Sequence, residues 1–209
     1  MTTYFSSDFH IGHKLVSGLR EFWTYDQDGA KVPDTEAHDR TLAENWDAVV
    51  QPEDTVWILG DMSINSGAQV TEWLSQRPGT KHLVSGNHDR THTAIFPKYY
   101  KNKIAQWTPF FASIQDEAVI EIAGQEVVLS HFPYWSWGDG PEVRESAGPG
   151  FQARYEKFRP WEGEKTILVH GHTHSHERDH ERSYHVGLDA HELQLVPEQT
   201  IIDWVQTLD

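Results

Sequence analysis

Seven side chains that can bind a divalent metal ion follow short apolar runs at five places along the chain. They are Asp8, His10, Asp61, Asn87, His131, His172 and His174. Carboxylate, amide and imidazole donors of this kind suit Mn²⁺, Fe, Zn²⁺ or Co²⁺ better than Ca²⁺ or Cu⁺. One ion takes roughly four or five such ligands, so seven donors that share one carboxylate indicate two ions. Two ions held close together by a bridging carboxylate are suited to in-line displacement at phosphorus.

The elements that must position these donors are short runs rich in Val, Ile, Leu and aromatic residues, which are typical of buried strands. They span residues 2–7, 55–59, 81–85, 126–130 and 166–169. A candidate ligand comes at or shortly after the end of each run. Because α/β proteins place their sites at the carboxyl ends of strands, we expect the donors to meet at one edge of a sheet.

Helical patterns lie between these strands. After Asp34, apolar residues fall on one helical face, a second and weaker helix is predicted over residues 68–76, and residues 197–208 combine a first-turn proline with an apolar stripe. Residues 110–122 and 126–129 predict a β-hairpin around a Gly-containing turn. This order of elements predicts an α/β protein with a mixed sheet, or with two sheets packed together.

Residues 134–164 differ from the rest of the chain because they are rich in proline, glycine and tryptophan. A loop this long in a compact domain is usually functional or disordered, and we interpret it as a substrate-facing lid whose tryptophans could stack on a nucleobase. Arginines here and elsewhere could form forked hydrogen bonds with a phosphate, or be used in surface salt bridges instead. The candidates are Arg20, Arg144, Arg154 and Arg159, of which Arg154 is selected as substrate-binding.

Composition narrows the class of protein. A length of 209 residues fits one domain, here residues 1–209. The absence of cysteine excludes disulfides, thiolate zinc sites and a cysteine nucleophile. The net charge of −15 argues against duplex nucleic acid as a partner. Without an apolar run of about 18 residues or a basic amino-terminal segment, we expect a cytoplasmic protein with no membrane partner. The oligomeric state stays open.

The order of the motifs allows a comparison with known families. They are Asp8-x-His10, Gly60-Asp61, Gly86-Asn87-His88-Asp89, His131 and Gly171-His172-Thr173-His174. This set resembles the calcineurin-like metallophosphoesterase superfamily, and residues 8–13, 129–133 and 186–190 resemble a small bacterial and phage branch of it. The motifs span residues 8–174. The resemblance implies a four-layer αββα sandwich, with two mixed β-sheets packed together and flanked by helices.

The resemblance also implies a role for each motif residue. The first ion would be held by Asp8, His10 and His174. The second would be held by Asn87, His131 and His172, and Asp61 would bridge the two. His88 would protonate the leaving group and Asp89 would orient His88, while a water or hydroxide bridging the ions would attack phosphorus. Manganese is the favoured metal, with iron, zinc, cobalt and nickel as alternatives.

The resemblance therefore implies a metal-dependent phosphoesterase acting on a small, or nucleotide-type, phosphate ester. Phosphodiesters are favoured, and phosphomonoesters on the same site are the alternative. An alternative of another class is a non-catalytic metal-binding scaffold, although scaffolds tend to lose ligands that this chain retains.

Single residues admit other interpretations. Taken alone, a histidine such as His131 is more often a satisfied polar group, and Gly60-Asp61 is more often a turn. His13 either contacts substrate or caps the helix that follows it. His170 could support a metal ligand through a hydrogen bond to its second ring nitrogen.

Overall fold

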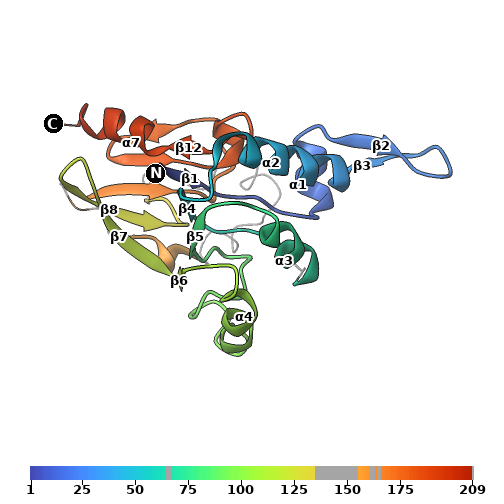
Figure 1. Ribbon diagram of the computed structural model, residues 1–209, viewed down its shortest axis with the longest axis horizontal. Helices are drawn as coiled ribbons and strands as arrows, with labels where there is room; N and C mark the ends of the chain where they lie inside the picture. Colours follow the sequence, from blue (N-terminus) through green and yellow to red (C-terminus); the bar gives the residue numbers. More distant parts are fainter. Residues whose placement is uncertain (65–66, 135–154, 161–162, 164–165, 209) are drawn as a thin grey trace.

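The computed structural model describes residues 1–64, 67–134, 155–160, 163 and 166–208, and these form two mixed β-sheets flanked by helices (Figure 1). The two-sheet α/β architecture predicted from the sequence is therefore confirmed. No helix within these ranges has the length and apolar character needed to cross a membrane.

The first sheet carries the amino-terminal half of the chain, with strands in the order β12-β1-β4-β5-β6. Their bounds are Val196–Pro197 for β12, Thr3–Ser6 for β1, Thr55–Ile58 for β4, Thr80–Val84 for β5 and Ser113–Gln115 for β6. The last four are parallel, and β12 is antiparallel to β1. The carboxyl ends of four strands thus point toward the same edge.

The second sheet has the order β10-β11-β9-β8-β7. Its strands are β10 (Asp179–His180), β11 (Ser183–His185), β9 (Ile167–His170), β8 (Gln125–Ser130) and β7 (Glu117–Ile122). The three central strands are parallel, and the two outer strands are antiparallel to their neighbours. A parallel bridge between Ser7 and Gly187 joins the segments that follow β1 and β11, so the two sheets meet where their parallel strands end.

The helices lie around this pair of sheets. They are α1 (Lys14–Leu19), α2 (Thr35–Val49), α3 (Ala68–Ser75), α4 (Tyr100–Trp107) and α7 (Glu198–Val205), with short 3₁₀ turns η1 (Glu156–Phe158) and η2 (Leu188–Ala190). The predicted cap of α2 is confirmed, because the Asp34 carboxylate accepts a hydrogen bond of 2.8 Å from the backbone amide of Ala37. A hairpin of β2 (Trp23–Tyr25) and β3 (Lys31–Pro33) projects from the body (Figure 1).

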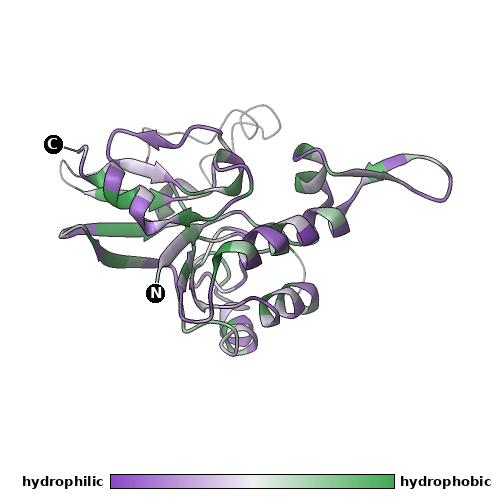
Figure 2. Ribbon diagram, turned by 45° about the horizontal axis from the view of Figure 1, so that its top comes forward, coloured by the Kyte–Doolittle hydropathy of each residue, from purple (hydrophilic) through white to green (hydrophobic). Residues whose placement is uncertain are grey.

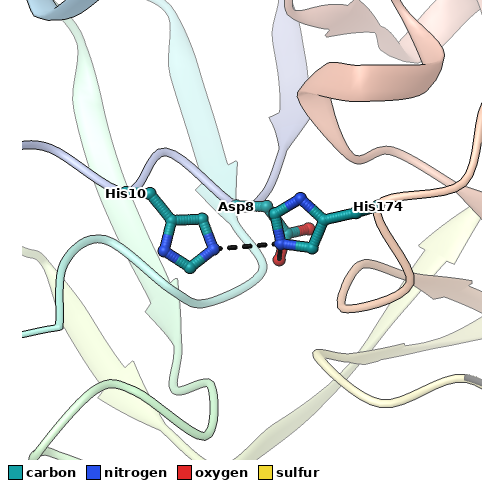
Figure 3. Close-up of side chains that lie close together, drawn as sticks. All are labelled: Asp8, His10 and His174. Atoms are coloured by element: carbon teal, nitrogen blue, oxygen red, sulfur yellow. Dashed lines mark hydrogen bonds and ion pairs between the residues drawn. The ribbon is translucent and has the colours of Figure 1, made fainter. Parts of the chain in front are cut away.

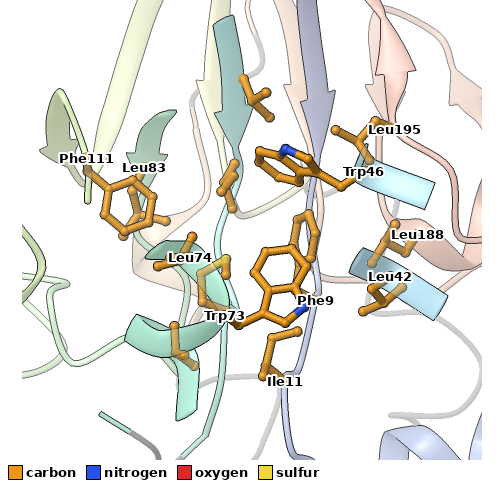
Figure 4. Packing of buried hydrophobic residues seen from close by; sticks show 14 of the residues in the cluster. Phe9, Ile11, Leu42, Trp46, Trp73, Leu74, Leu83, Phe111, Leu188 and Leu195 are labelled. Carbon is orange, nitrogen blue, oxygen red and sulfur yellow. The ribbon is translucent and has the colours of Figure 1, made fainter. Parts of the chain in front are cut away.

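Two apolar cores fix the first sheet on both of its faces. One core packs the sheet against α2 and α3, where the rings of Phe9, Trp46 and Trp73 contact one another at centroid distances of 5.6–5.9 Å (Figure 4). Successive residues of β4 divide between the cores, since Ile58 belongs to the core against the helices and Trp57 packs against the core between the sheets.

The second core lies between the sheets and extends to α7. It joins residues of both sheets, such as Phe5 and Leu129, to Ile201 and Trp204 of α7. Figure 2 shows the hydropathy of these elements: many sheet strands are apolar, whereas the helices combine polar and apolar residues. Because both cores are buried, the strand ends that carry the candidate ligands are anchored on two sides.

The prediction of one strand over residues 110–122 is wrong. The chain forms β6, pairs with β5 in the first sheet, and then enters β7 in the second sheet. Asp116 lies between the end of β6 and the start of β7, and its carboxylate accepts a hydrogen bond of 3.0 Å from the backbone amide of Thr93. The β7–β8 hairpin itself is confirmed, and Ala123 and Gly124 form its turn with positive φ angles of 52° and 75°.

Pro197 also differs from its predicted place. It lies at the N-cap of α7, where it pairs with Tyr4 as part of β12, and the helix begins one residue later. Most of the predicted lid, residues 134–164, falls outside the described residues.

Candidate metal centre

The structure brings all seven predicted donors together where the two sheets meet. Asp8 follows β1, Asp61 follows β4, Asn87 follows β5, His131 follows β8, and His172 and His174 follow β9. Consecutive contacts of 2.8–3.8 Å connect them from Asp8 through His174, His10, Asp61 and His131 to Asn87 and His172.

The first group of donors consists of Asp8, His10 and His174 (Figure 3). The Nε2 atoms of the two histidines lie 3.1 Å apart, and Asp8 Oδ1 lies 3.7 Å from His174 Nε2. The other oxygen of Asp8 accepts hydrogen bonds from the Ser7 hydroxyl and the His172 amide. Oδ1 is buried and has no hydrogen-bond partner among the described residues, so it is left to face the histidines.

The second group lies around His131. Its Nδ1 is 2.8 Å from the Leu59 carbonyl oxygen, so this nitrogen carries the proton and Nε2 is left with a lone pair. That Nε2 faces Asn87 Oδ1 at 2.8 Å and His172 Nδ1 at 3.1 Å. The Nε2 lone pair and the Asn87 oxygen repel each other at this distance. A cation bound to both atoms would remove the repulsion.

Asp61 connects the two groups. Its Oδ2 lies 3.8 Å from His10 Nε2 and 3.5 Å from His131 Nε2, while its Oδ1 accepts a hydrogen bond of 2.9 Å from the His88 amide. One carboxylate is therefore held between both sets of imidazoles, which is the placement that a bridging ligand requires.

The backbone at the site is unusual. Five of the seven donors adopt positive φ angles between 50° and 76°, a region that non-glycine residues rarely occupy; they are Asp8, His10, Asp61, His172 and His174. These five donors follow β1, β4 and β9, so the chain turns through left-handed backbone directly after these three strands. Outliers of this kind concentrate at functional sites, where the surrounding packing holds them.

Gly60 shows how tightly these turns are packed. Its φ is 87°, and a Cβ atom there would lie 2.5 Å from His131 Nδ1 and 2.7 Å from the Gly86 Cα. The narrow space and the positive φ angle both require glycine here, because no side chain fits the space and few other residue types tolerate the angle. The loops that carry Asp61 and Asn87 are therefore in direct backbone contact.

Burial and charge set the protonation of the first group. Burial and the neighbouring His174 hold the pKa of His10 well below its ordinary value, which keeps its ring neutral. Burial opposes the charged form of His174 too, but hydrogen bonding to Asp189 and the charge of Asp8 raise its pKa. The pKa of Asp8 is lowered despite its burial, chiefly by His174 and His131.

His88 lies at the edge of the site, with 35% of its side chain exposed and its Nε2 3.8 Å from Asp61 Oδ2. Asp89 was expected to orient His88, but its carboxylate accepts hydrogen bonds from the backbone amides of Asp61, Met62 and Gly86. Within the described residues, no hydrogen bond joins it to the His88 ring. Burial and the charge of Asp61 raise the pKa of Asp89 to about 7. In this structure Asp89 fixes the ligand loops to each other.

Of the predicted substrate contacts, His13 lies beside the site, with its ring centroid 5.4 Å from that of His10. It also occupies the N-cap position of α1, as the capping interpretation has it, but its side chain makes no capping hydrogen bond. Arg144 and Arg154 lie outside the described residues. His170 is buried and its Nδ1 lies 2.9 Å from the Gly171 carbonyl oxygen, next to the ligand-bearing loop.

Arg20 corrects the sequence interpretation of the arginines. Its guanidinium is already engaged, because it donates two hydrogen bonds of 2.8 Å to the Asp189 carboxylate. Asp189 Oδ2 in turn lies 2.8 Å from His174 Nδ1. Burial alone would raise the pKa of Asp189, but its bonds to Arg20 and His174 hold that pKa well below the usual range. The Arg20–Asp189 pair therefore holds the His174 ring so that its Nε2 faces the other donors.

The Arg20 guanidinium also connects the site to the helices. It donates to the backbone carbonyl of Asp8 at 2.8 Å and lies 3.0 Å from His38 Nε2. His38 contacts Asp39, and Asp39 accepts from the Gly12 amide at 2.9 Å. This buried network was missed from the sequence, although residues 186–190, which contain Asp189, formed part of the motif comparison.

The residues present fit a divalent metal ion on their own chemistry. The ligand atoms of Asp8, His10 and His174 lie within 4.8 Å of one another, and so do those of Asp8, Asp61 and His131. An unpartnered buried carboxylate oxygen and several inward-facing ring nitrogens are costly without a cation and favourable with one.

Comparison with known proteins shows which family this chain is similar to. A family model described as the calcineurin-like phosphoesterase superfamily domain matches residues 1–188. The gene 66 protein of Mycobacterium phage L5 is 38% identical, over 97% of this chain and 93% of that protein, and its counterpart in Mycobacterium phage D29 is 35% identical, over 99% and 96%. A crystal structure of a protein of unknown function from Aquifex aeolicus has a TM-score of 0.62 at 23% identity, covering 97% of this chain and 98% of that one, and it shares the fold.

Proposed function

The chain belongs to the calcineurin-like phosphoesterase superfamily, and we propose that it is a phosphoester hydrolase that works with two divalent metal ions. The observation that carries the proposal is the position of Asp61, whose Oδ2 lies between His10 and His131. Two donor groups on either side of one carboxylate match the requirement for a pair of ions.

We assign the ligands as follows. Asp8, His10 and His174 would hold one ion, Asn87, His131 and His172 would hold the other, and Asp61 would be shared by both. When bound, two divalent cations supply Lewis-acid activation of water and of the phosphoryl oxygens, and manganese is our first choice among iron, zinc, cobalt and nickel.

His88 is the residue we assign to proton transfer. Its backbone amide donates a hydrogen bond to Asp61 Oδ1, while its ring is partly exposed and so can reach a substrate. A histidine in this place can donate a proton to the departing alkoxide oxygen. His13, whose ring centroid lies 5.4 Å from that of His10, is our candidate for contact with the substrate.

The charge of the site supports an anionic substrate. Only two of the acidic residues, Asp8 and Asp61, belong to the assigned ligands, so two divalent ions leave the site positive on a chain whose net charge is −15. A small phosphate ester can bind there without a basic surface, while the acidic exterior disfavours a duplex. We favour phosphodiesters, including nucleotide-type esters, with phosphomonoesters as the alternative.

The test is hydrolysis by protein loaded with a defined metal. We expect Mn²⁺-loaded protein to hydrolyse bis-p-nitrophenyl phosphate faster than p-nitrophenyl phosphate. His131→Asn should abolish activity, whereas His82→Asn, which alters a histidine bonded to Ser113 outside the site, should retain it. Hydrolysis of neither ester by metal-loaded protein would refute the proposal and favour the non-catalytic scaffold.

A further inference from the structure

The segment of residues 8–12 lies between β1 and α1 and carries two of the candidate ligands. Its side chains at Phe9 and Ile11 are buried in the apolar core against α2 and α3 (Figure 4). Three of its backbone amides donate hydrogen bonds of 2.9–3.0 Å to carbonyl oxygens that follow β4. Gly12 lies just beyond these bonds, and its amide is 2.9 and 3.2 Å from the two carboxylate oxygens of Asp39. The end of the ligand segment is therefore held to a side chain of α2.

The Asp39 carboxylate is surrounded by neutral hydrogen-bond donors. They are the Gly12 amide, Gln69 Nε2 at 2.9 Å and His38 Nδ1 at 2.9 Å. The direction of the histidine bond follows from Arg20, because a guanidinium can only donate and His38 Nε2, 3.0 Å from Arg20 Nη1, must accept. His38 Nδ1 then carries the ring proton and donates it to the carboxylate. One side chain thus receives donors from α2, from α3 and from the ligand segment.

This carboxylate occupies a place on α2 where an apolar side chain would be expected. The buried face of the helix consists of His38, Asp39, Leu42 and Trp46, of which the last two belong to the apolar core. Burial of a carboxylate costs free energy that burial of an apolar side chain does not, and aspartate is also a weak helix former. The Asp39 side chain is nevertheless only 11% exposed. The bonds that offset this cost are those that hold Gly12 and Gln69.

Gly12 is enclosed from a second side as well. Its φ is 73°, and a Cβ atom there would collide with Oε1 of Gln69, the side chain that also donates to Asp39. Helices α2 and α3 therefore grip one backbone turn, which follows His10 by two residues and directly precedes His13. A shift of this turn would displace both imidazole rings.

We propose that Asp39 is a positioning residue of the metal centre, which holds the Gly12 turn so that His10 faces the first group of donors. The proposal rests on the proposed function, because it takes the first group to hold a metal ion. Among the described residues, no candidate ligand side chain contacts Asp39, so Asp39 acts through the backbone of the ligand segment. Its effect should therefore be confined to the ion assigned to Asp8, His10 and His174.

The test is calorimetric titration with Mn²⁺ in two backgrounds, each with one group of donors disabled. His131→Ala leaves the first group to bind an ion, and His10→Ala leaves the second. Addition of Asp39→Asn should weaken Mn²⁺ binding by about tenfold in the His131→Ala background and leave it unchanged in the His10→Ala background, since asparagine cannot accept from all three donors. Equal losses in both backgrounds, or no loss in either, would overturn the proposal.

Asp54→Asn is the matched control. Asp54 is also buried, and its carboxylate accepts hydrogen bonds from the backbone amides of Thr2 and Gln51, at the end of β1 that lies away from the site. In urea unfolding the control should lose stability as Asp39→Asn does, but it should keep its Mn²⁺ affinity in both backgrounds. A tenfold loss of affinity in the control would show that any destabilisation weakens the site, and would overturn the assignment.

Gln69→Ala is a milder variant that keeps the test decisive if Asp39→Asn does not fold. Gln69 is exposed on α3, and its replacement removes only one of the three donors to Asp39. We expect about threefold weaker Mn²⁺ binding in the His131→Ala background, as loss of one hydrogen bond allows, and no change in the His10→Ala background. Unchanged binding in both would count against a positioning role.

Hydrolysis assays separate this proposal from the proposed function, because metal binding requires no ester. If the metal-loaded wild-type protein hydrolyses neither p-nitrophenyl ester but Asp39→Asn weakens Mn²⁺ binding in the His131→Ala background alone, the hydrolase proposal fails and the positioning role stands. If the wild-type protein hydrolyses an ester and Asp39→Asn leaves Mn²⁺ affinity unchanged in both backgrounds, the positioning role fails and the hydrolase proposal stands.

Discussion

Replacement of Asp189 by asparagine tests whether the buried network behind His174 holds the metal centre in place. Asparagine keeps the shape of the side chain but removes the charge that faces Arg20 and His174. The side chains of Arg20 and Asp189 are only 4% and 12% exposed, so the guanidinium of the variant would lose its counter-ion in a site with little water.

The expected loss of stability follows from this burial. Removing one partner of a buried ion pair typically costs about 3–5 kcal/mol. Arg20 keeps its hydrogen bond to the Asp8 carbonyl, and asparagine still offers an acceptor oxygen, so we expect the lower end, about 3 kcal/mol. If His174 holds a metal ion as we propose, loss of the carboxylate behind it should also weaken metal affinity by about 10- to 100-fold.

Two measurements and one control decide the outcome. Urea unfolding of chelator-treated protein gives the free energy of unfolding, and calorimetric titration with Mn²⁺ gives the affinity. The control is Asp47→Asn, which breaks a second Arg–Asp pair, that of Asp47 and Arg77, at a position where Asp47 is 46% exposed. We expect the control to lose no more than about 1 kcal/mol and to keep its Mn²⁺ affinity.

Equal losses of stability in Asp189→Asn and Asp47→Asn would show that the buried Arg20–Asp189 pair contributes no more to the free energy of unfolding than the more exposed Arg77–Asp47 pair. An unchanged Mn²⁺ affinity in Asp189→Asn would show that the network does not position His174. The combination Arg20→Met/Asp189→Asn adds a further check, since removal of both charges should recover part of the stability lost in the single variant.

Three further predictions concern other parts of the site. His88→Ala should lower kcat by about 10²- to 10⁴-fold while calorimetry shows both ions still bound, and an unchanged kcat would remove His88 from proton transfer. In urea unfolding, Gly124→Ala should lower the free energy of unfolding by roughly 1 kcal/mol, and Gly60→Ala should lower it several times more. Both glycines have positive φ, but only Gly60 is enclosed by other atoms, so equal losses would contradict the packing argument. Burial lowers the pKa of His185 to about 4, so on acidification the unfolded chain binds a proton at His185 before the folded protein does. The free energy of unfolding of chelator-treated protein should therefore fall by roughly 3 kcal/mol between pH 6.5 and pH 4. His185→Asn should reduce this dependence on pH, and an unaltered dependence would contradict the lowered pKa.

The elements with a clear hydrophobic period were predictable from the sequence. The helix after Asp34, the helix near residues 68–76 and the five apolar strands all lie close to their predicted places. The missed elements are short or weakly patterned. Helix α1 has six residues and no side-chain cap, and it exposes Leu15 and Leu19, so neither its length nor its periodicity distinguishes it from a loop.

The division of residues 110–122 between two sheets could not be predicted in the same way. Both β6 and β7 are short strands, and local alternation of side chains does not say which neighbour each strand will pair with. The pairing is decided by contacts distant in sequence, such as Asp116 with Thr93 and β6 with β5.

The candidate ligands were predictable because each follows the carboxyl end of a strand, although these strands belong to two sheets that meet at the site rather than to the single sheet edge that we expected. The residues behind the ligands were not. Arg20 and Asp189 are 169 positions apart, and a sequence alone offers Arg20 many other partners, including a phosphate. Asp89 was given a partner side chain, yet its carboxylate binds backbone amides, which carry no sequence signal.

The left-handed turns that carry five of the donors have a consequence for the evolution and engineering of this protein. At these positions glycine would relieve backbone strain of about 1–2 kcal/mol per residue, so a search for thermostable variants would favour the loss of a ligand. Stability and metal binding thus select opposite residues at the same places, and glycine at any of the five in a related chain would indicate that selection for the metal centre has relaxed there.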